Sequence, residues 1–386
     1  MGTGTKCLPV AKYSNVGDTV HDLHGEVVAR RAAVRWFLCE MARSSSEWLE
    51  QIVDQDTKAT LFRLKPGVKL HMYISELPCN AAFGGAASMN TLGYLQTLRD
   101  PKMAALKRTN DLDASPRYSE GVARDRNGYQ LIDVVRTKPG RGDSPRTNAM
   151  SCSDKIALWS VIGIQGALAV SLGLQPIHID MITIGSVKGV DLLESREELI
   201  YQDCLRAFFG RLERCSSHGL ATLSTSLIHQ KADTTSDYEV HRPNIVFTST
   251  AFDGGRDVAA QNEKSSSNEA LCWVADEDDG IAKEILVNGT RRGVLPKDRS
   301  RPSSSASLLP SSLPLTALTA ITVPCDTLET ARVANLEEGE EEQHPISGVG
   351  WRSYFEAKHG PGTQRYHEVK SNLRGMGGAS TGLGNL

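Results

Sequence analysis

Apolar side chains recur at helical spacing in two segments of the chain. Over residues 19–53 they return every three or four positions, which predicts a long helix. The buried face of that helix would carry five apolar side chains: Val27, Val28, Val34, Phe37 and Leu38. Residues 196–213, REELIYQDCLRAFFGRLE, predict a second and strongly amphipathic helix.

Shorter apolar runs predict buried strands between these helices. LHMYISEL (70–77), IHIDMITIGS (177–186) and PNIVFTST (243–250) have the length and the β-branched or aromatic content of strands. Because strands and helices alternate along the chain, we expect an α/β fold in which a central sheet is covered by helices.

One apolar segment, residues 156–174, is long enough to cross a bilayer and carries no charge. Gln165 and several glycines interrupt it, Pro176 ends it, and the anchors that flank membrane helices are missing. We therefore expect a buried core helix that starts near Cys152, and we expect no membrane partner.

The composition changes after about residue 298. A Ser- and Pro-rich stretch is followed by the acidic run LEEGEEEQ (336–343), a composition typical of disorder. We expect a disordered insertion at 298–345, between the main part of one domain at 1–297 and a C-terminal helical part of the same domain at 346–386.

Charge and cysteine content narrow the class of protein. With 43 Lys and Arg against 46 Asp and Glu, the net charge of −3 means that a nucleic-acid partner would be held by local basic patches. The eight cysteines lie far apart, which favours reduced thiols or metal ligands over a disulfide framework. The first residues contain no apolar signal region, so we expect a location in the nucleus, the cytoplasm or both.

The segment HDLHGEVVARR contains a histidine and a glutamate two positions apart, His24 and Glu26, and Pro78-Cys79 follows downstream. H-x-E followed by Pro-Cys opens the zinc nucleobase-deaminase signature, in which His and thiolates bind zinc while the Glu moves protons. On a helix His24 and Glu26 would face apart, but at a helix N-terminus both could reach one pocket. Position 82 is Ala, so the signature lacks its second local thiol.

Cys152 is the candidate for the missing ligand. It lies just before Ser153 and Asp154, which resemble the cap and first turn of the apolar helix. A helix N-terminus favours the thiolate form that zinc requires. The alternative is that Cys152 is a small buried residue, as most reduced cysteines are.

Four segments together carry a family resemblance: HDLHGEVVARR, LHMYISELPC, RTKPGRGDSPRTNAMSCSDKIALW and GIQGAL. In this order and spacing they resemble the adenosine deaminases that act on RNA, most closely the tRNA-specific branch of eukaryotes. The resemblance implies a cytidine-deaminase-like central mixed sheet covered by helices. It also implies hydrolysis of adenosine to inosine beside the anticodon, with tRNA as the partner and no DNA.

The resemblance also assigns residues. It implies zinc bound by His24, Cys79 and Cys152, with Glu26 as the proton shuttle. It further implies a buried inositol hexakisphosphate, whose contacts would be Arg30, Arg31, Lys155, Trp159, Tyr354, Lys358, Tyr366 and Lys370. From spacing alone, the arginines could equally be solvated and the Tyr/Lys pairs could be surface helix contacts.

The sequence departs from the family pattern in three places. Leu158 stands where the family has an arginine beside the tryptophan, and the stretch after Cys79, PCNAAFGGAAS, contains an apparent insertion. The chain begins at TGTKC and ends at GLGNL, and we expect it to be truncated at both ends relative to the family.

Basic residues on a Gly- and Pro-rich loop are the candidates for contact with RNA phosphates. They are Arg136, Lys138, Arg141 and Arg146. Three alternatives to tRNA editing stay open: a non-catalytic zinc-containing RNA-binding protein, a deaminase acting on other structured RNA, and a deaminase of free nucleosides.

Overall fold

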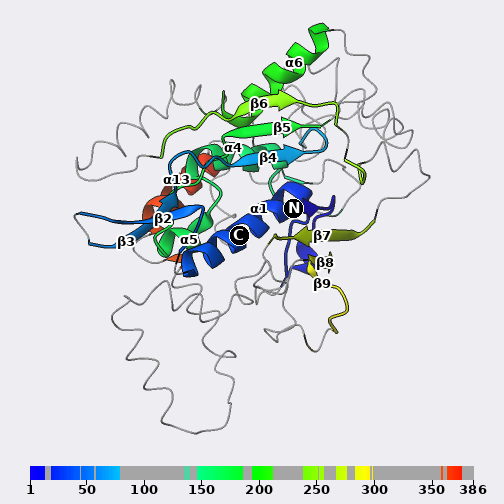
Figure 1. The fold of residues 1–386 in the computed structure, drawn as a ribbon. Helices are drawn as coiled ribbons and strands as arrows, with labels where there is room; N and C mark the ends of the chain where they lie inside the picture. Colours follow the sequence, from blue (N-terminus) through cyan, green and yellow to red (C-terminus); the bar gives the residue numbers. More distant parts are fainter. Residues whose placement is uncertain are drawn as a thin grey trace, which may run out of the picture. The chain divides into compact units, whose positions relative to one another are not determined.

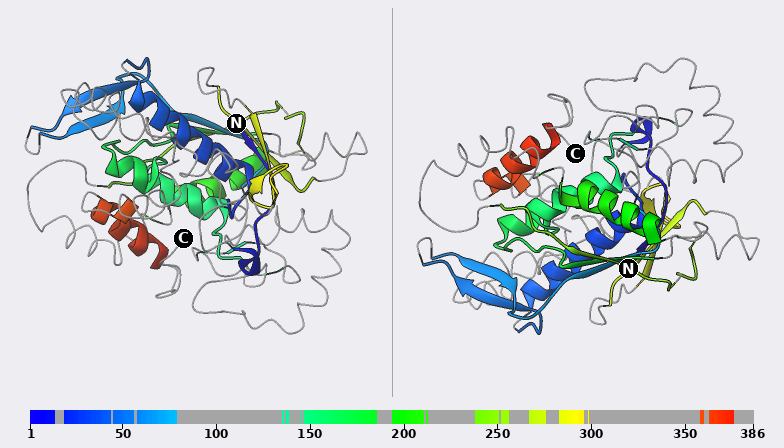
Figure 2. Two further views of the ribbon diagram at one scale, coloured as in Figure 1. Left: turned by 90° about the horizontal axis from the view of Figure 1, so that it is seen from below. Right: turned by 90° about the horizontal axis from the view of Figure 1, so that it is seen from above.

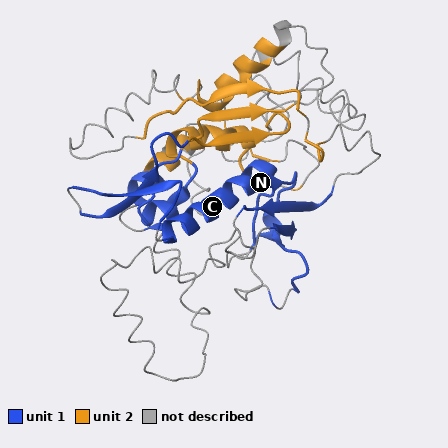
Figure 3. Ribbon diagram, viewed as in Figure 1, with its two compact units in different colours: residues 1–68, 164–177, 267–367 blue, residues 69–163, 178–266, 368–386 orange. Residues whose placement is uncertain are grey.

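The computed structural model describes most of the predicted elements and leaves several long segments out. The described residues are 1–13, 19–43, 45–55, 58–78, 135, 137–138, 145, 147–185, 194–210, 212, 238–250, 252–255, 267–275, 283–295, 298, 358–359 and 363–375. They fall into two compact units (Figure 3). Unit 1 comprises residues 1–68, 164–177 and 267–367, and unit 2 comprises 69–163, 178–266 and 368–386.

Unit 1 is built on a four-stranded antiparallel sheet and one long helix. The sheet has the order β1 (Gly2–Thr3), β7 (Glu269–Trp273), β8 (Lys283–Val287) and β9 (Thr290–Arg291). Helix α1 (Gly25–Ala42) packs against β1 and β7 (Figure 1). A Cβ on Gly2 would lie 2.4 Å from the backbone nitrogen of Ala29, so this close approach of strand and helix requires glycine. The shared core consists of Val20, Leu23, Val28, Ala32, Ala270, Cys272, Val274 and Leu286.

The predicted helix over 19–53 is wrong at both ends. α1 begins at Gly25 and ends at Ala42, and Arg43 adopts an extended backbone. Residues Leu49–Val53 form β2, which pairs antiparallel with β3 (Thr60–Leu64), and Figure 2 shows the two as a long ribbon. Residues 49–53 form a strand because their backbone groups pair with β3. The helical spacing of apolar residues gives no information about such a partner strand.

The predicted apolar helix is divided in two. α4 (Cys152–Ile162) ends at Gly163, whose φ of 71° lies in the left-handed region, and the short helix α5 (Gly166–Ser171) follows. Within the part of the chain that the structure describes, no helix is both long and apolar enough to cross a membrane.

Unit 2 contains a three-stranded parallel sheet with the order β4 (His71–Ile74), β5 (Met181–Ile184) and β6 (Asn244–Phe247) (Figure 1). Ile182 and Ile184 of the central strand are completely buried. Helix α6 (Glu194–Leu205) continues into a π-helical turn, Arg206–Gly210, which packs against α4. The three strands predicted from the sequence are confirmed, as is a mixed α/β fold.

The C-terminal helix α13 (Gln364–Gly375) lies in the segment where helix was expected. Of the predicted insertion at 298–345, the structure describes only Asp298; the rest lies outside the described residues, so the insertion stays a prediction.

Two stacked histidines precede β5 and β6 in unit 2. The rings of His178 and His241 lie 5.0 Å apart at 22°, and His178 Nε2 is 3.1 Å from the carbonyl oxygen of Val161. Burial lowers the pKa of His178, the nearby His241 adds to this, and the Val161 carbonyl and Asp180 oppose it. Burial therefore favours the neutral form of the His178 imidazole in the folded protein.

A lowered histidine pKa makes stability depend on pH in a defined direction. The unfolded chain takes up a proton near the ordinary histidine pKa of about 6.5, whereas folded His178 does so only at lower pH. Stability from this group is thus complete above about pH 6.5 and is lost as the pH falls towards the folded pKa. We expect His178→Phe, which keeps a ring in the stack, to weaken the fall of melting temperature between about pH 7.5 and 5.5.

Calorimetry at a series of pH values measures this difference. The exposed His71, on β4 of the same unit, provides the control. His71→Gln should leave the slope unchanged, and equal slopes for His178→Phe and the unaltered protein would contradict the assignment.

Candidate metal centre

The start of α1 places the histidine and glutamate of the H-x-E motif at one helix end. His24 is the N-cap, with an extended backbone (φ −67°, ψ 144°), and Glu26 lies in the first turn. The backbone nitrogen of Gly25 donates to the carbonyl oxygen of Gly4 at 3.0 Å, which connects this end of the helix to the residue that follows β1. The predicted position of both residues at a helix N-terminus is therefore what the structure shows.

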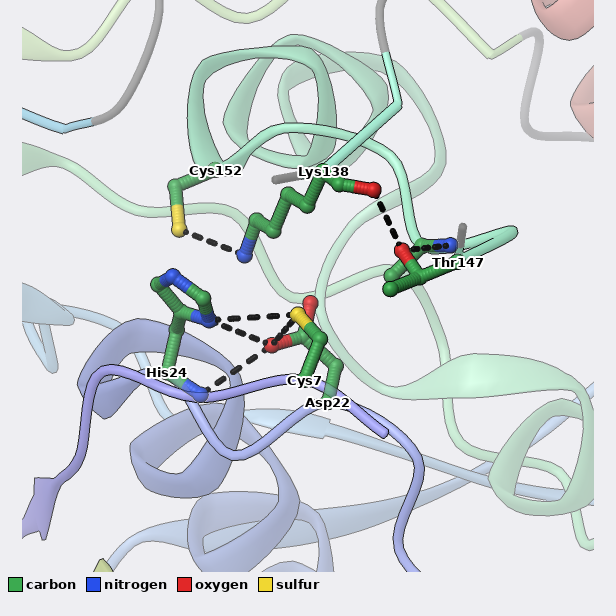
Figure 4. A network of polar contacts seen from close by, with 7 residues as sticks. Cys7, Asp22, His24, Lys138, Thr147 and Cys152 are labelled. Atoms are coloured by element: carbon green, nitrogen blue, oxygen red, sulfur yellow. Dashed lines mark hydrogen bonds and ion pairs between the residues drawn. The ribbon is translucent and has the colours of Figure 1, made fainter. Parts of the chain in front are cut away.

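Asp22 holds His24 in place. Its Oδ1 accepts a hydrogen bond from the backbone nitrogen of His24 at 3.0 Å and lies 2.8 Å from His24 Nδ1 (Figure 4). The Asp22 side chain is 6% exposed and that of His24 21%. A carboxylate against the imidazole of a metal-binding histidine is a common support, because it fixes the orientation of the ring.

The thiol of Cys7 completes a compact group of donor atoms. Cys7 Sγ lies 3.4 Å from Asp22 Oδ1 and 3.5 Å from His24 Nδ1 (Figure 4). Among the residues that the structure describes, this is the one group of three His, Cys, Asp or Glu side chains able to hold an ion, with its ligand atoms within 4.8 Å of one another. Sequence reasoning missed Cys7 and Asp22. Asp22 stands two positions before His24, and this spacing was the available signal.

Cys152, the candidate third ligand, lies in unit 2 as the first residue of α4 and is 1% exposed. The N-cap of this helix is Ser151, whereas the sequence predicts Ser153 as the cap. Ser151 Oγ accepts from the backbone nitrogen of Asp154 at 3.1 Å and donates to the carboxylate of Asp154 at 2.6 Å. Cys152 is therefore at the positive end of a well-capped helix.

Lys138 contacts this cysteine directly. Its Nζ is 3.0 Å from Cys152 Sγ, and Lys138 is 3% exposed (Figure 4). Two hydrogen bonds fix the backbone of Lys138. Its backbone nitrogen donates to the carbonyl oxygen of Ala149 at 2.7 Å, and its carbonyl oxygen accepts from Thr147 Oγ1. A neighbouring ammonium favours the thiolate, which is the form that binds metal.

Lys138 is also one of the predicted RNA contacts. It is 3% exposed, with its ammonium on the Cys152 sulfur, so the described contact of this side chain is with the cysteine. Its contact with RNA stays a prediction. Arg136, Arg141 and Arg146 lie outside the described residues, and their contact with RNA stays a prediction.

The complete zinc ligand set stays a prediction as well. Pro78 is buried at the end of the described segment, and Cys79 lies outside the described residues. His24 belongs to unit 1 and Cys152 to unit 2.

Comparison with known proteins identifies the family. Residues 1–377 match the adenosine-deaminase (editase) domain. The chain belongs to this family. It is 27% identical over 304 residues to tRNA-specific adenosine deaminase 1 of Schizosaccharomyces pombe, which covers 77% of this chain and 67% of the relative. The corresponding protein of Drosophila melanogaster is 28% identical over 302 residues, covering 77% of this chain and 64% of the relative.

A double-stranded RNA-specific adenosine deaminase of Mus musculus is also similar to this editase domain. It is 29% identical over 188 residues, covering 48% of this chain and 15% of the mouse protein. The resemblance predicted from the four sequence segments is therefore confirmed, and with it the enzyme class, an adenosine deaminase acting on RNA.

The GIQGAL segment of the editase domain has a structural explanation. Gln165 is completely buried, and its Oε1 accepts from the backbone nitrogen of Ile177 at 3.0 Å. Arg30 Nε donates to the carbonyl oxygen of Ile164 at 2.6 Å. A Cβ on Gly166, whose φ is 77°, would lie 2.6 Å from the Arg30 guanidinium, so both backbone and packing require glycine.

The other residues predicted to contact inositol hexakisphosphate are distributed over several elements. Arg31 lies on α1 and is half-buried, and Lys155 and the buried Trp159 lie on α4. Tyr366 and Lys370 lie on α13; Tyr366 is 3% exposed. The carbonyl oxygen of Lys358 is 2.6 Å from His367 Nε2, and Tyr354 lies outside the described residues. The polyphosphate site stays a prediction.

Proposed function

We propose that this editase domain hydrolyses adenosine to inosine in tRNA, beside the anticodon, on a cytidine-deaminase-like arrangement of mixed sheet and helices. The observation that carries the proposal is the start of α1, where His24 caps the helix against Asp22 and Glu26 stands in the first turn. A chain of this family with that motif in that position has the groups that adenosine hydrolysis requires.

His24, Cys79 and Cys152 are the proposed zinc ligands, with water in the fourth position. The donor types fit, because one imidazole and two thiolates form a standard zinc deaminase set. Two further contacts support the fit: Asp22 supports His24, and the Lys138 ammonium favours the thiolate of Cys152.

Zinc, when bound, supplies a water whose pKa falls from 15.7 to about 7, which is the nucleophile for C6 of adenine. Glu26 would take the proton that the attacking water loses and pass it to the ring nitrogen next to C6. It would then move the proton of the new C6 hydroxyl to the amino group, so that the bond from C6 to this nitrogen breaks and ammonia leaves. Adenosine and water are converted to inosine and ammonia.

A tRNA anticodon loop suits this chemistry because its bases are already unpaired. A deaminase must take its target base out of the stack, and this costs less in a loop than in a duplex. The yeast and fly relatives named for tRNA cover 77% of this chain, and a double-stranded RNA-specific editase of Drosophila melanogaster covers 71%, so the choice of tRNA rests on the unpaired bases of the loop. Arg136, Arg141 and Arg146 are the proposed phosphate contacts.

Mass spectrometry of RNA incubated with the purified full chain tests the proposal. We expect inosine in tRNA. Inosine formed only from free adenosine would indicate a nucleoside deaminase, and bound zinc without any product would indicate a non-catalytic RNA-binding protein. Product in duplex RNA but not in tRNA would overturn the substrate.

We also propose inositol hexakisphosphate as a buried second cofactor. The basic residues Arg30, Arg31, Lys155, Lys358 and Lys370 match the resemblance to the family and are each partly buried. A polyanion bound during folding would offset the cost of taking such charges out of water. It would act as a structural cofactor and not as a reactant.

Two measurements test this second cofactor. Analysis of the acid-denatured, purified full chain should find one inositol polyphosphate per protein. Protein produced in cells that lack inositol hexakisphosphate should be insoluble or inactive. Soluble and active protein that releases no inositol phosphate would show that the site does not exist.

A further inference from the structure

The thiol of Cys7 has a defined place beside the proposed zinc ligand His24 and is not among the proposed ligands. Cys7 Sγ donates towards Asp22 Oδ1 at 3.4 Å and lies 3.5 Å from His24 Nδ1 (Figure 4). The same Asp22 oxygen accepts from the backbone nitrogen of His24 and approaches its ring. One carboxylate oxygen thus connects the thiol, the backbone and the imidazole.

Backbone pairing sets the position of Cys7. Cys7 and Asp22 form an antiparallel bridge. On either side of it, the backbone nitrogen of Leu8 donates to the carbonyl of His21 at 2.8 Å, and that of Leu23 donates to the carbonyl of Lys6 at 2.9 Å. The thiol therefore stays beside the Asp22 carboxylate without relying on a long, flexible side chain.

The burial of Asp22 gives the thiol a physical task. A carboxylate that is 6% exposed must be hydrogen-bonded, because an unpaired buried charge is expensive. The backbone nitrogen of His24 and the thiol of Cys7 both donate to Oδ1. Removing the thiol would take one hydrogen-bond donor away from the Asp22 carboxylate. It would also leave space beside Nδ1 of His24, so that both side chains could rotate.

We propose that Cys7 is a positioning residue of the zinc centre: it holds Asp22, and through Asp22 it orients the imidazole of His24 towards the metal. Cys7 is not itself a ligand. This inference rests on the proposed function, because it assumes that His24 binds zinc. Changing such an outer partner of a metal-binding histidine typically lowers metal affinity by about 10- to 100-fold.

The test uses the full chain and two metals, Zn²⁺ and Co²⁺. Zinc affinity is measured by competition with a chelator for the unaltered protein, Cys7→Ala and Cys7→Ser. We expect Cys7→Ala to bind zinc about 10-fold more weakly or worse, and Cys7→Ser, which keeps a hydrogen-bond donor, to recover much of the loss. In the Co²⁺ forms, the thiolate-to-cobalt charge-transfer intensity should be the same in all three proteins.

Each other outcome overturns the inference in a different way. Reduced charge-transfer intensity in Cys7→Ala would make Cys7 a ligand. A lower melting temperature of the metal-free variant, with unchanged zinc affinity, would make its role purely structural. The matched control is Cys39→Ser, a second partly buried thiol of unit 1, on α1, which should bind zinc normally.

The failure of the proposed function is distinguishable from the failure of this inference. Unaltered protein without bound zinc would overturn both. Unaltered protein with stoichiometric zinc and equal affinity in Cys7→Ala would overturn the role of Cys7 alone.

Discussion

Cys152→Ala is expected to abolish zinc binding and inosine formation together. A catalytic zinc site has only three protein ligands, and water fills the fourth position. Loss of one thiolate leaves two protein ligands, which is too few to bind zinc at ordinary affinity. Metal analysis of the purified variant should find no stoichiometric zinc, and the yield of inosine in tRNA should fall to background. The buried position of Cys152 at the start of α4, against the Lys138 ammonium, is the structural basis for this expectation.

Cys204 provides the matched control in the same unit. It is also completely buried, but burial raises the pKa of its thiol to about 12, so that it stays protonated and is a poor metal ligand. Cys204→Ala should therefore keep its zinc. Stoichiometric zinc in Cys152→Ala would contradict the assignment of Cys152 as the third ligand.

Glu26→Ala is expected to keep zinc and lose the reaction. Glu26 is not a proposed ligand, and its removal takes away the group that accepts and returns the proton. General acid–base catalysis contributes about 10²–10⁴-fold, so the rate of inosine formation should fall by at least that range. Single-turnover assays of inosine in tRNA, together with metal analysis of the same preparation, separate the two effects.

The control for Glu26 is Glu47, an exposed glutamate in unit 1. Glu47→Ala should retain both zinc and activity. Near-normal turnover in Glu26→Ala would eliminate its role as proton shuttle, and loss of zinc from this variant would mean that Glu26 supports the metal itself.

These two variants also distinguish the rival functions. A non-catalytic RNA-binding protein would lose zinc in Cys152→Ala but would show no change in product for Glu26→Ala, since neither protein forms inosine. A nucleoside deaminase would respond to both variants with free adenosine and would leave tRNA unchanged.

The helix that carries the motif was predictable because its signals are local. The spacing of His24 and Glu26 and the apolar face of α1 all lie within a few turns of one helix, and neighbouring residues in sequence are neighbours in a helix. The strands β4, β5 and β6 were predictable for the same reason, since each lies within one short segment rich in β-branched and other apolar residues. The four spaced segments then indicated the editase family, which the match over residues 1–377 confirmed.

Local spacing failed where distant partners decide the structure. Residues 49–53 continue the apolar pattern of the helix, yet they form β2, because β3 supplies their hydrogen bonds. The apolar run after Cys152 is interrupted at Gly163, where a positive φ ends α4, and residues 164–177 belong to the other unit.

The sequence alone determined the family, the H-x-E motif at a helix start and the residue types available for zinc. Only the tertiary structure placed Lys138 against Cys152, Arg30 over Gly166, and Cys7 and Asp22 against His24. Cys7 stands 17 residues before His24 and Lys138 stands 14 residues before Cys152. Contacts over such separations depend on backbone pairing and on burial across the fold. The spacing of residues along the sequence predicts neither the pairing nor the burial.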